Sequence, residues 1–164
     1  MHYLVRLIVQ AEDKSEAISR AHQFADDLTG EGDKPFDWYD FSGRWGDTNE
    51  TTTLATSEEG QALIAEGMKL QRADFDAAMK NIRFMLEHTD DEIYENEFKK
   101  EGRPEEAYYP DRYQFYKASE YTQGYVYVEG WSTGHIGNEK DLSGALEVGQ
   151  GENPYWVVPV DMHS

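Results

Sequence analysis

Three ionisable residues in the C-terminal part of the chain have the types and spacing of a small acid–base or metal site. Asp161 and His163 are two positions apart, so on a strand their side chains point to the same side. A carboxylate beside an imidazole can orient it as a general base or join it in a metal site. His135 is a candidate third member, as is His2 if the terminal strands pair.

These residues would supply the ligands of a catalytic zinc or manganese site. Three protein ligands are the minimum for such a site, and Asp161, His163 and His135 provide that number. A divalent metal is therefore the one cofactor that the sequence leaves open, and Asp161 and His163 are the candidate catalytic residues. The competing interpretation is a frayed C-terminal tail with no chemistry.

A second candidate site, for binding an anion, lies in the segment FDWYDFSGRWGD, residues 36–47. As a ligand site, Arg44 would lie between Trp38 and Trp45, with its guanidinium free to bind a carboxylate or phosphate. As a folding device, the aromatic side chains dock on the core and Arg44 pairs with an aspartate of the same segment. These aspartates are Asp37, Asp40 and Asp47. The second interpretation is favoured, because a chain with 33 acidic residues offers an arginine many partners.

A candidate partner surface follows in residues 87–111, which carry ten carboxylates against three basic side chains. A solvated helical face is one interpretation of this pattern. A binding surface is the other, because the tyrosine-rich stretch 108–127 overlaps it and tyrosine is enriched in protein interfaces. Residues 108–127 could instead form a tyrosine-rich edge of the core or a surface for homo-oligomerisation. The candidate partner-binding residues are Glu92, Glu95, Glu97, Tyr108 and Tyr109.

Composition excludes several classes of function. The net charge of −18 repels nucleic acid and anionic membranes, so direct nucleic-acid binding is disfavoured. The absence of cysteine excludes disulfides and cysteine nucleophiles. No apolar run is long enough to cross a membrane. We therefore expect a cytoplasmic protein, or a protein of the host cytoplasm or virion if its origin is viral.

The elements that must position these residues follow from hydrophobic periodicity. Residues 3–10 alternate with apolar residues on both faces, which predicts a strand inside a sheet. Asp13 and Glu16 form a capping-box pattern at the start of a helix that should end near Gly30. The Thr- and Asn-rich residues 47–56 are expected to be exposed.

The second half of the chain adds helices and two strands. A long helix is expected over 57–88, with a break or bend near Gly67, and a short helix should follow from about residue 90. Residues 124–131 and 155–164 read as strands, with a loop at 132–144. Pro159 lacks an amide donor, which predicts a sheet edge or a bulge.

These elements predict one α+β domain over residues 1–164. Its antiparallel or mixed sheet would carry helices on one face, with a helical hairpin inserted at about 57–102, and a ferredoxin-like arrangement is one candidate. The first and last ten residues should pair as neighbouring strands.

The chain resembles a set of uncharacterised phage and prokaryotic proteins of similar size. They carry a W-Y-x-x-G-G-R-W element after an opening strand and helix, and they end in a strand reading V-D-x-H. The matching residues here are Trp38, Tyr39, Gly43, Arg44 and Trp45, then Val160, Asp161 and His163. Ser42 replaces the first glycine of the pair. The resemblance implies a viral or mobile-element origin and brings no established activity.

Three functions are consistent with these features. The favoured hypothesis is an acidic binding protein that engages a protein partner, as a nucleic-acid mimic or as an inhibitor of a host enzyme that handles nucleic acid. The alternative is a small enzyme or ligand-binding domain that uses Arg44 as an anion clamp and Asp161 with His163 as acid–base or metal residues. The third is an acidic accessory or virion protein of a halophilic system. An enzyme is the less favoured class.

Overall fold

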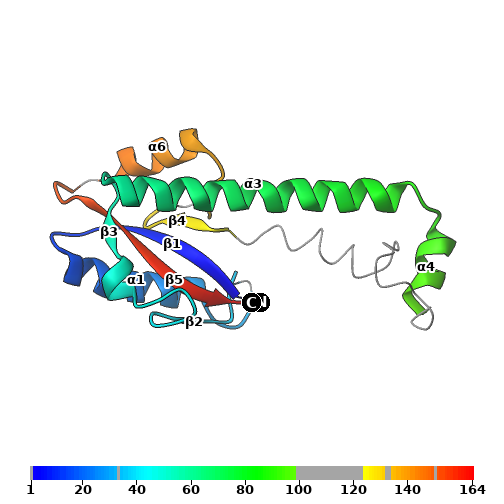
Figure 1. The fold of residues 1–164 in the computed structure, drawn as a ribbon, viewed down its shortest axis with the longest axis horizontal. Coiled ribbons are helices and arrows are strands. Elements are labelled where there is room, and N and C mark those ends of the chain that lie inside the picture. The colour runs from blue at the N-terminus through cyan, green and yellow to red at the C-terminus, as the bar shows by residue number, and fades with distance from the viewer. Residues whose placement is uncertain (1, 33, 99–123, 132–133, 150) are drawn as a thin grey trace. The chain divides into compact units, whose positions relative to one another are not determined.

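The two ends of the chain form neighbouring strands. The computed structural model describes residues 2–32, 34–98, 124–131, 134–149 and 151–164. Strand β1 (His2–Gln10) pairs antiparallel with β5 (Tyr155–His163), from His2 opposite His163 to Gln10 opposite Tyr155. Figure 1 shows these two strands side by side. The predicted pairing of the terminal segments is confirmed.

The sheet is mixed and has β1 in its interior. Strand β4 (Val126–Val128) pairs parallel to β1, while β2 (Trp38–Asp40) and β3 (Thr53–Leu54) pair antiparallel to the outer side of β5. The order is β2-β5-β1-β4, with β3 beside β2 on the same side of β5. The α+β class and the interior position of the first strand are confirmed.

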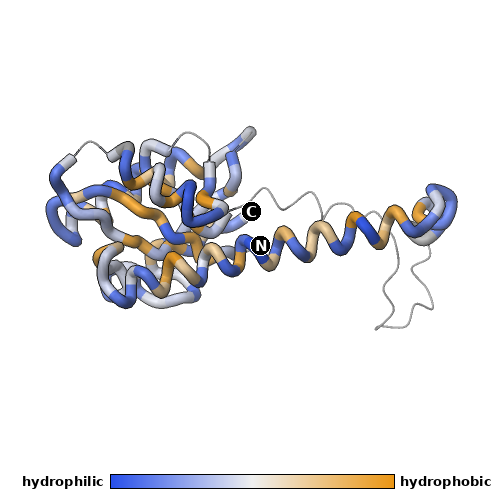
Figure 2. Tube along the Cα trace, turned by 90° about the horizontal axis from the view of Figure 1, so that it is seen from above, coloured by the Kyte–Doolittle hydropathy of each residue, from blue (hydrophilic) through white to orange (hydrophobic). Residues whose placement is uncertain are grey.

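Helices cover both faces of the sheet, where we expected them on one. Odd-numbered residues of β1 such as Val5 pack against the buried alanines of α1 (Lys14–Leu28). On the other face, Ile8 packs with Ile64 of α3 (Glu58–Leu86) and Ala145 of α6 (Glu139–Val148). In Figure 2, apolar residues run along the strand segments, whereas polar and apolar residues alternate along the long helix α3. This arrangement departs from the ferredoxin-like candidate, in which the helices share one face.

Helix α6 is an element that the sequence analysis missed, because residues 132–144 were read as a loop. Asn138 caps this helix by accepting a hydrogen bond from the backbone N–H of Asp141 at 3.0 Å. Leu142, Ala145 and Leu146 then pack against the core at helical spacing. The glycines around residue 137 obscured this cap, although Asn is among the preferred N-cap residues.

The segment 47–56 is buried in part, contrary to expectation. It forms α2 (Thr48–Thr51) and β3, and Thr48 and Thr52 are each only 3% exposed. The Thr48 hydroxyl donates to the carbonyl oxygen of Pro159 at 2.9 Å. Because the N and C=O of a strand residue point to the same side, the missing donor of Pro159 faces this hydroxyl and not β1. Pro159 therefore sits inside the sheet, in the gap between the short strands β2 and β3.

Helix α3 continues through Gly67 without the predicted break. A Cβ atom at Gly67 would lie 2.5 Å from Cγ2 of Val126 and 3.1 Å from Cδ of Arg6. Glycine is therefore needed for the close approach of α3 to the sheet and not for a bend.

The chain divides into two compact units, Met1–Gln71 with Gln123–Ser164, and Arg72–Thr122. Helix α3 begins in the first unit and continues in the second, which also contains α4 (Asp90–Phe98). The single domain over 1–164 with a helical insertion at about 57–102 stays a prediction. Among the described residues, no helix is both long enough and apolar enough to span a membrane.

Candidate functional site

Three aromatic rings form a row across one end of the sheet. His2 of β1 is paired with His163 of β5, and His163 is paired with Trp38 of β2. Their side chains therefore lie on one face of three neighbouring strands. The indole of Trp38 stacks on the His163 ring, with centroids 5.2 Å apart and planes at 16°. The His2 ring meets His163 edge-on at 5.1 Å and Trp38 edge-on at 5.5 Å. We call Trp38, His163 and His2 the ring row.

A buried carboxylate supports this row. Asp161 is 5% exposed, and its Oδ1 atom lies 2.9 Å from Nδ1 of His2. Its Oδ2 atom accepts a hydrogen bond from the backbone N–H of Arg44 at 3.2 Å. The structure thus joins Asp161 to His2, its diagonal neighbour across the β1–β5 pair, and not to His163. Nδ1 of His163 instead lies 3.5 Å from Oδ2 of Asp37.

The turn after β2 is fixed against Asp161 by a glycine. A Cβ atom at Gly43 would lie 2.6 Å from Cβ of Asp161, so a side chain at this position would displace the turn. The neighbouring Ser42 is exposed, and its N–H and hydroxyl both donate to Oδ1 of Asp40. Of the two glycines in the W-Y-x-x-G-G-R-W motif, this chain therefore keeps Gly43, the one that packs against Asp161. On the opposite side, Phe41 stacks on His22 of α1 at 3.6 Å.

Arg44 does not pair with the aspartates of its own segment, so that prediction is wrong. Asp37 faces His163, Asp40 bonds to Ser42, and Asp47 caps α2 by accepting from the N–H of Asn49. The hydrogen bonds to Asn49 lower the pKa of Asp47. The guanidinium of Arg44 is exposed and makes no ion pair, hydrogen bond or ring stacking with any described residue.

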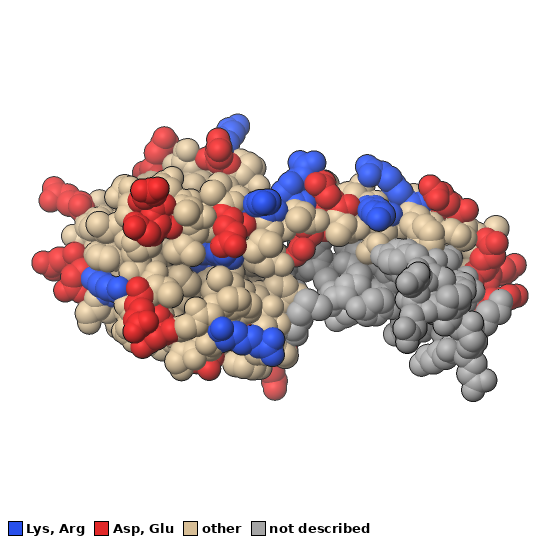
Figure 3. Space-filling model, in the orientation of Figure 1, with Lys and Arg blue, Asp and Glu red and all other residues tan. Residues whose placement is uncertain are grey.

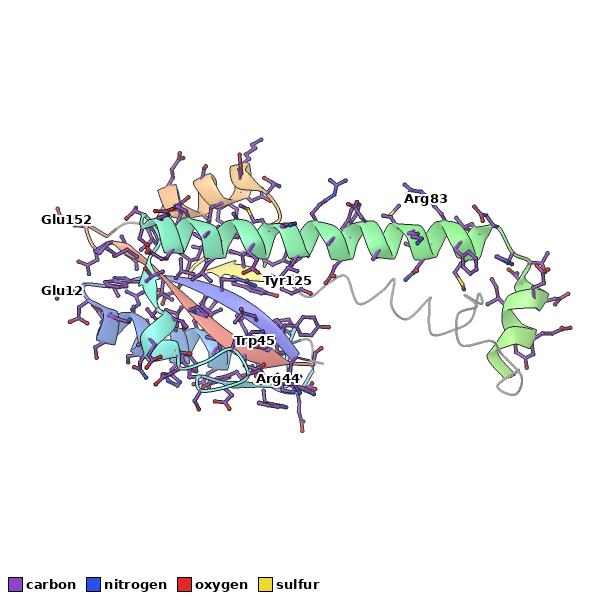
Figure 4. All side chains as sticks on the ribbon, in the orientation of Figure 1. Glu12, Arg44, Trp45, Arg83, Tyr125 and Glu152 are labelled. Carbon is purple, nitrogen blue, oxygen red and sulfur yellow. The ribbon has the colours of Figure 1, made fainter. Side chains whose placement is uncertain are left out.

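Arg44 is also not enclosed by the two tryptophans, as a clamp would require. Trp38 and Trp45 are 45% and 42% exposed, and neither stacks on the guanidinium. Figure 4 shows Arg44 and Trp45 on the turn beside the C-terminal end of β5. The structure therefore brings the two sequence motifs together through Asp161, with the charged end of Arg44 directed to solvent.

The space beside Asp161 is too small for a substrate. A hollow lined in part by Trp45, Leu4 and Asp161 has a volume of about 10 Å³, which is close to the minimum for a single water molecule. A ligand beside Asp161 would therefore have to lie outside this hollow.

The structure does not bring His135 to Asp161 and His163. His135 bridges to Tyr127 of β4, which is paired with Leu7, five residues from His2 along β1. At about 3.3 Å per residue, Leu7 lies roughly 17 Å along β1 from the level of His163 and roughly 10 Å from that of Asp161, which is opposite Leu4. No group of three His, Asp or Glu side chains that could hold a metal ion occurs among the residues described. Burial lowers the pKa of His135, and the charge of Asp141 offsets part of this effect.

The candidate partner surface is described only in part. Asp90, Asp91, Glu92 and Glu95 are exposed on α4, where Figure 3 shows carboxylates gathered. Glu92 also has a structural role. The N–H of Thr89 donates to its carboxylate and its own N–H donates to the hydroxyl of Thr89, which forms a capping box, and the hydrogen bonds from Thr89 lower the pKa of Glu92. Tyr108 and Tyr109, and the side chain of Glu97, lie outside the described residues.

Sequence reasoning missed a buried arginine in β1. Arg6 is 0% exposed, and its Nη2 atom lies 2.6 Å from Oε2 of Glu66 on α3, while Nη1 donates to the carbonyl of Leu4 at 2.6 Å. Burial lowers the pKa of Arg6, and the charge of Glu66 opposes this change. The only signal in the sequence was one cation in a strand whose two faces are otherwise mostly apolar.

Glu66 also lines an open groove of about 880 Å³ between α3 and the 50–53 segment. The walls include threonines of that segment, Leu63 and Lys69. None of the predicted site residues lines this groove.

The comparisons with known proteins place the chain in a family. The family described as "Domain of unknown function (DUF7995)" matches residues 1–164, so the chain belongs to it. No curated protein and no solved structure matches the chain.

Proposed function

We propose that this member of the family is a binding protein that holds a small anionic ligand on the surface where β1, β2 and β5 meet. The observation that carries the proposal is the guanidinium of Arg44, which is exposed and has no ion-pair partner among the described residues. Three aspartates lie within seven positions of Arg44, and each is engaged elsewhere. A planar guanidinium that is exposed and not paired in this way can bind a carboxylate or phosphate with two parallel hydrogen bonds.

The backbone under Arg44 is fixed, which favours binding. Its N–H donates to the buried carboxylate of Asp161, and Gly43 packs against the same side chain. A fixed anchor loses less conformational entropy when a ligand binds. In this proposal Asp161 is a positioning residue, because it supports Arg44 and His2 and is itself buried.

The test is a titration of the ¹⁵N-labelled protein with inorganic phosphate and with acetate, followed by NMR at constant ionic strength. We expect the Arg44 side-chain signal and the ring-row signals to shift, and Arg44→Gln to weaken binding about tenfold. Arg83→Gln is the matched control, because Arg83 is also exposed and has no ion pair among the described residues, but lies on α3 in the other unit. Equal losses in the two variants, or no loss in Arg44→Gln, would overturn the proposal.

A second candidate function is the engagement of a basic protein partner through α4. The observation that favours it is the set of four exposed carboxylates on the described part of this helix, beside Tyr94, which is 70% exposed. A surface of this kind can compete with nucleic acid for a protein that binds phosphates. A viral or mobile-element origin, as the motif resemblance implies, would make a host enzyme that handles nucleic acid the partner.

This candidate is tested with the DNA-binding fraction of a bacterial lysate. The immobilised protein should retain basic proteins that added duplex DNA and rising salt release. Neutralising Asp90, Asp91, Glu92 and Glu95 should reduce the capture. A control variant neutralises four exposed carboxylates elsewhere, namely Glu12, Asp27, Glu31 and Glu152. Capture that resists both DNA and salt would contradict an electrostatic mimic.

A further inference from the structure

We infer that the ligand of this site is a planar aromatic anion, whose ring stacks on the outer face of Trp38 while its carboxylate or phosphate pairs with Arg44. This inference rests on the proposed anion-binding function and adds the chemical class of the ligand. It depends on the order of the strands, the support of the indole and the distribution of charge.

Strand order leaves one face of the indole available. The Trp38 ring stacks on His163 on its β5 side at 5.2 Å. Strand β2 is the outermost strand of its path, and no described strand pairs with its other edge. The side chain accordingly remains 45% exposed, although one face is in contact with a second ring. A flat π surface that is stacked on one side and open on the other suits a second planar ring.

The indole is held before any ligand arrives. The backbone N–H of Asp37 donates to the carbonyl oxygen of His163 at 2.7 Å, which fixes the entry into β2. The rings of His2 and Trp38 are nearly perpendicular, with centroids 5.5 Å apart, and Asp161 in turn fixes His2. A stacking surface ordered in this way binds at a lower entropic cost than a mobile side chain.

Charge places the anionic group of the ligand at Arg44. The carboxylate of Asp161 bonds to both the backbone N–H of Arg44 and the His2 ring. The backbone of Arg44 therefore lies beside the ring row. A single anion can use this cation, whereas a polyanion would be repelled by a chain of net charge −18. A small ligand is therefore favoured over a nucleic-acid strand.

The experiment compares probes that differ only in the ring. Phenyl phosphate is matched with methyl phosphate, and benzoate with acetate, by calorimetry and by the indole N–H signal of Trp38. We expect the aromatic member of each pair to bind about tenfold tighter, which corresponds to about 1.4 kcal/mol. Adenosine monophosphate distinguishes two classes of ligand. If it binds more tightly than benzoate, the ligand is a nucleotide; if it binds more weakly, the ligand is an aromatic carboxylate.

Variants of the two exposed tryptophans test the assignment. Trp38→Leu should abolish the preference for aromatic over aliphatic probes, while Trp38→Phe should retain it. Trp45→Leu is the matched control, because Trp45 is equally exposed but does not belong to the ring row. Thermal unfolding checks that each variant is folded.

The outcomes separate the inference from the proposed function. Equal binding of aromatic and aliphatic anions would overturn the stacking inference and leave the anion site intact. Binding of none of the probes would overturn both. Loss of the aromatic preference in Trp45→Leu but not in Trp38→Leu, or tighter binding of a trinucleotide than of adenosine monophosphate, would also overturn the inference.

Discussion

The Nδ1 atom of His2 lies 2.9 Å from Oδ1 of Asp161, a residue 159 positions later in the chain. This contact exists because the first and last strands pair in a register that sets His2 opposite His163. The second oxygen of Asp161 accepts from the N–H of Arg44, so one buried carboxylate connects both termini to the turn after β2.

We expect Asp161→Asn to destabilise the protein by about 1–3 kcal/mol, because His2 and Arg44 use different oxygens of Asp161 and an asparagine has only one. Asp40→Asn is the control and should cost less than about 0.5 kcal/mol, since both groups of Ser42 bond to the same oxygen of Asp40. Urea unfolding measures the free energies. Similar losses in the two variants would contradict the role given to Asp161.

Gly43→Ala should cost about 2 kcal/mol, because the added Cβ would lie 2.6 Å from Cβ of Asp161 and force the turn outward. Gly137→Ala is the matched control, with its nearest neighbour at 3.8 Å, and should change the free energy of unfolding by less than about 0.5 kcal/mol. A Gly43→Ala protein as stable as the wild type would show that the turn is not packed in this way.

Glycine-to-alanine substitution should stabilise the protein in one helix and destabilise it in another. Gly144→Ala in α6 should stabilise the protein by up to about 1 kcal/mol, because alanine favours the helix and the nearest atom, in Trp131, is 3.4 Å away. Gly67→Ala in α3 should destabilise it by about 1 kcal/mol, because contact with Val126 outweighs that gain. Thermal unfolding gives the sign of each change, and stabilisation by Gly67→Ala would contradict the close approach of α3.

His135 should make the stability depend on pH. Its pKa in the folded state is lowered by burial, so below about pH 6.5 the unfolded chain binds a proton that the folded chain resists. Stability contributed by the neutral imidazole is therefore present above that pH and lost as the pH falls. We expect the wild type to lose more free energy of unfolding between pH 7.5 and 5.5 than His135→Gln. Parallel pH curves for the two proteins would be the contrary result.

Strands β1, β4 and β5 and helices α1, α3 and α4 could be predicted because their signals are local, whereas the short strands β2 and β3 could not. The alternation in residues 3–10 and the capping box at Asp13 depend on neighbours within a few positions, and both elements form as expected. Helix α6 was missed because glycines surround its cap at Asn138, and Thr48 and Thr52 were wrongly expected to be exposed because threonine is polar. Thr48 is buried against Pro159, whose carbonyl oxygen its hydroxyl bonds to, more than a hundred positions away.

The candidate site shows the same division. The sequence by itself determined that the tryptophan-flanked Arg44 and the Asp161–His163 pair were the groups to consider, because residue type and spacing decide what chemistry a segment can offer. Only the tertiary structure decided which groups meet, since strand register is set by burial of whole faces across the sheet. That register set Asp161 beside His2 and stacked Trp38 on His163. It also kept His135, beside Tyr127, apart from both residues and left the guanidinium of Arg44 in solvent.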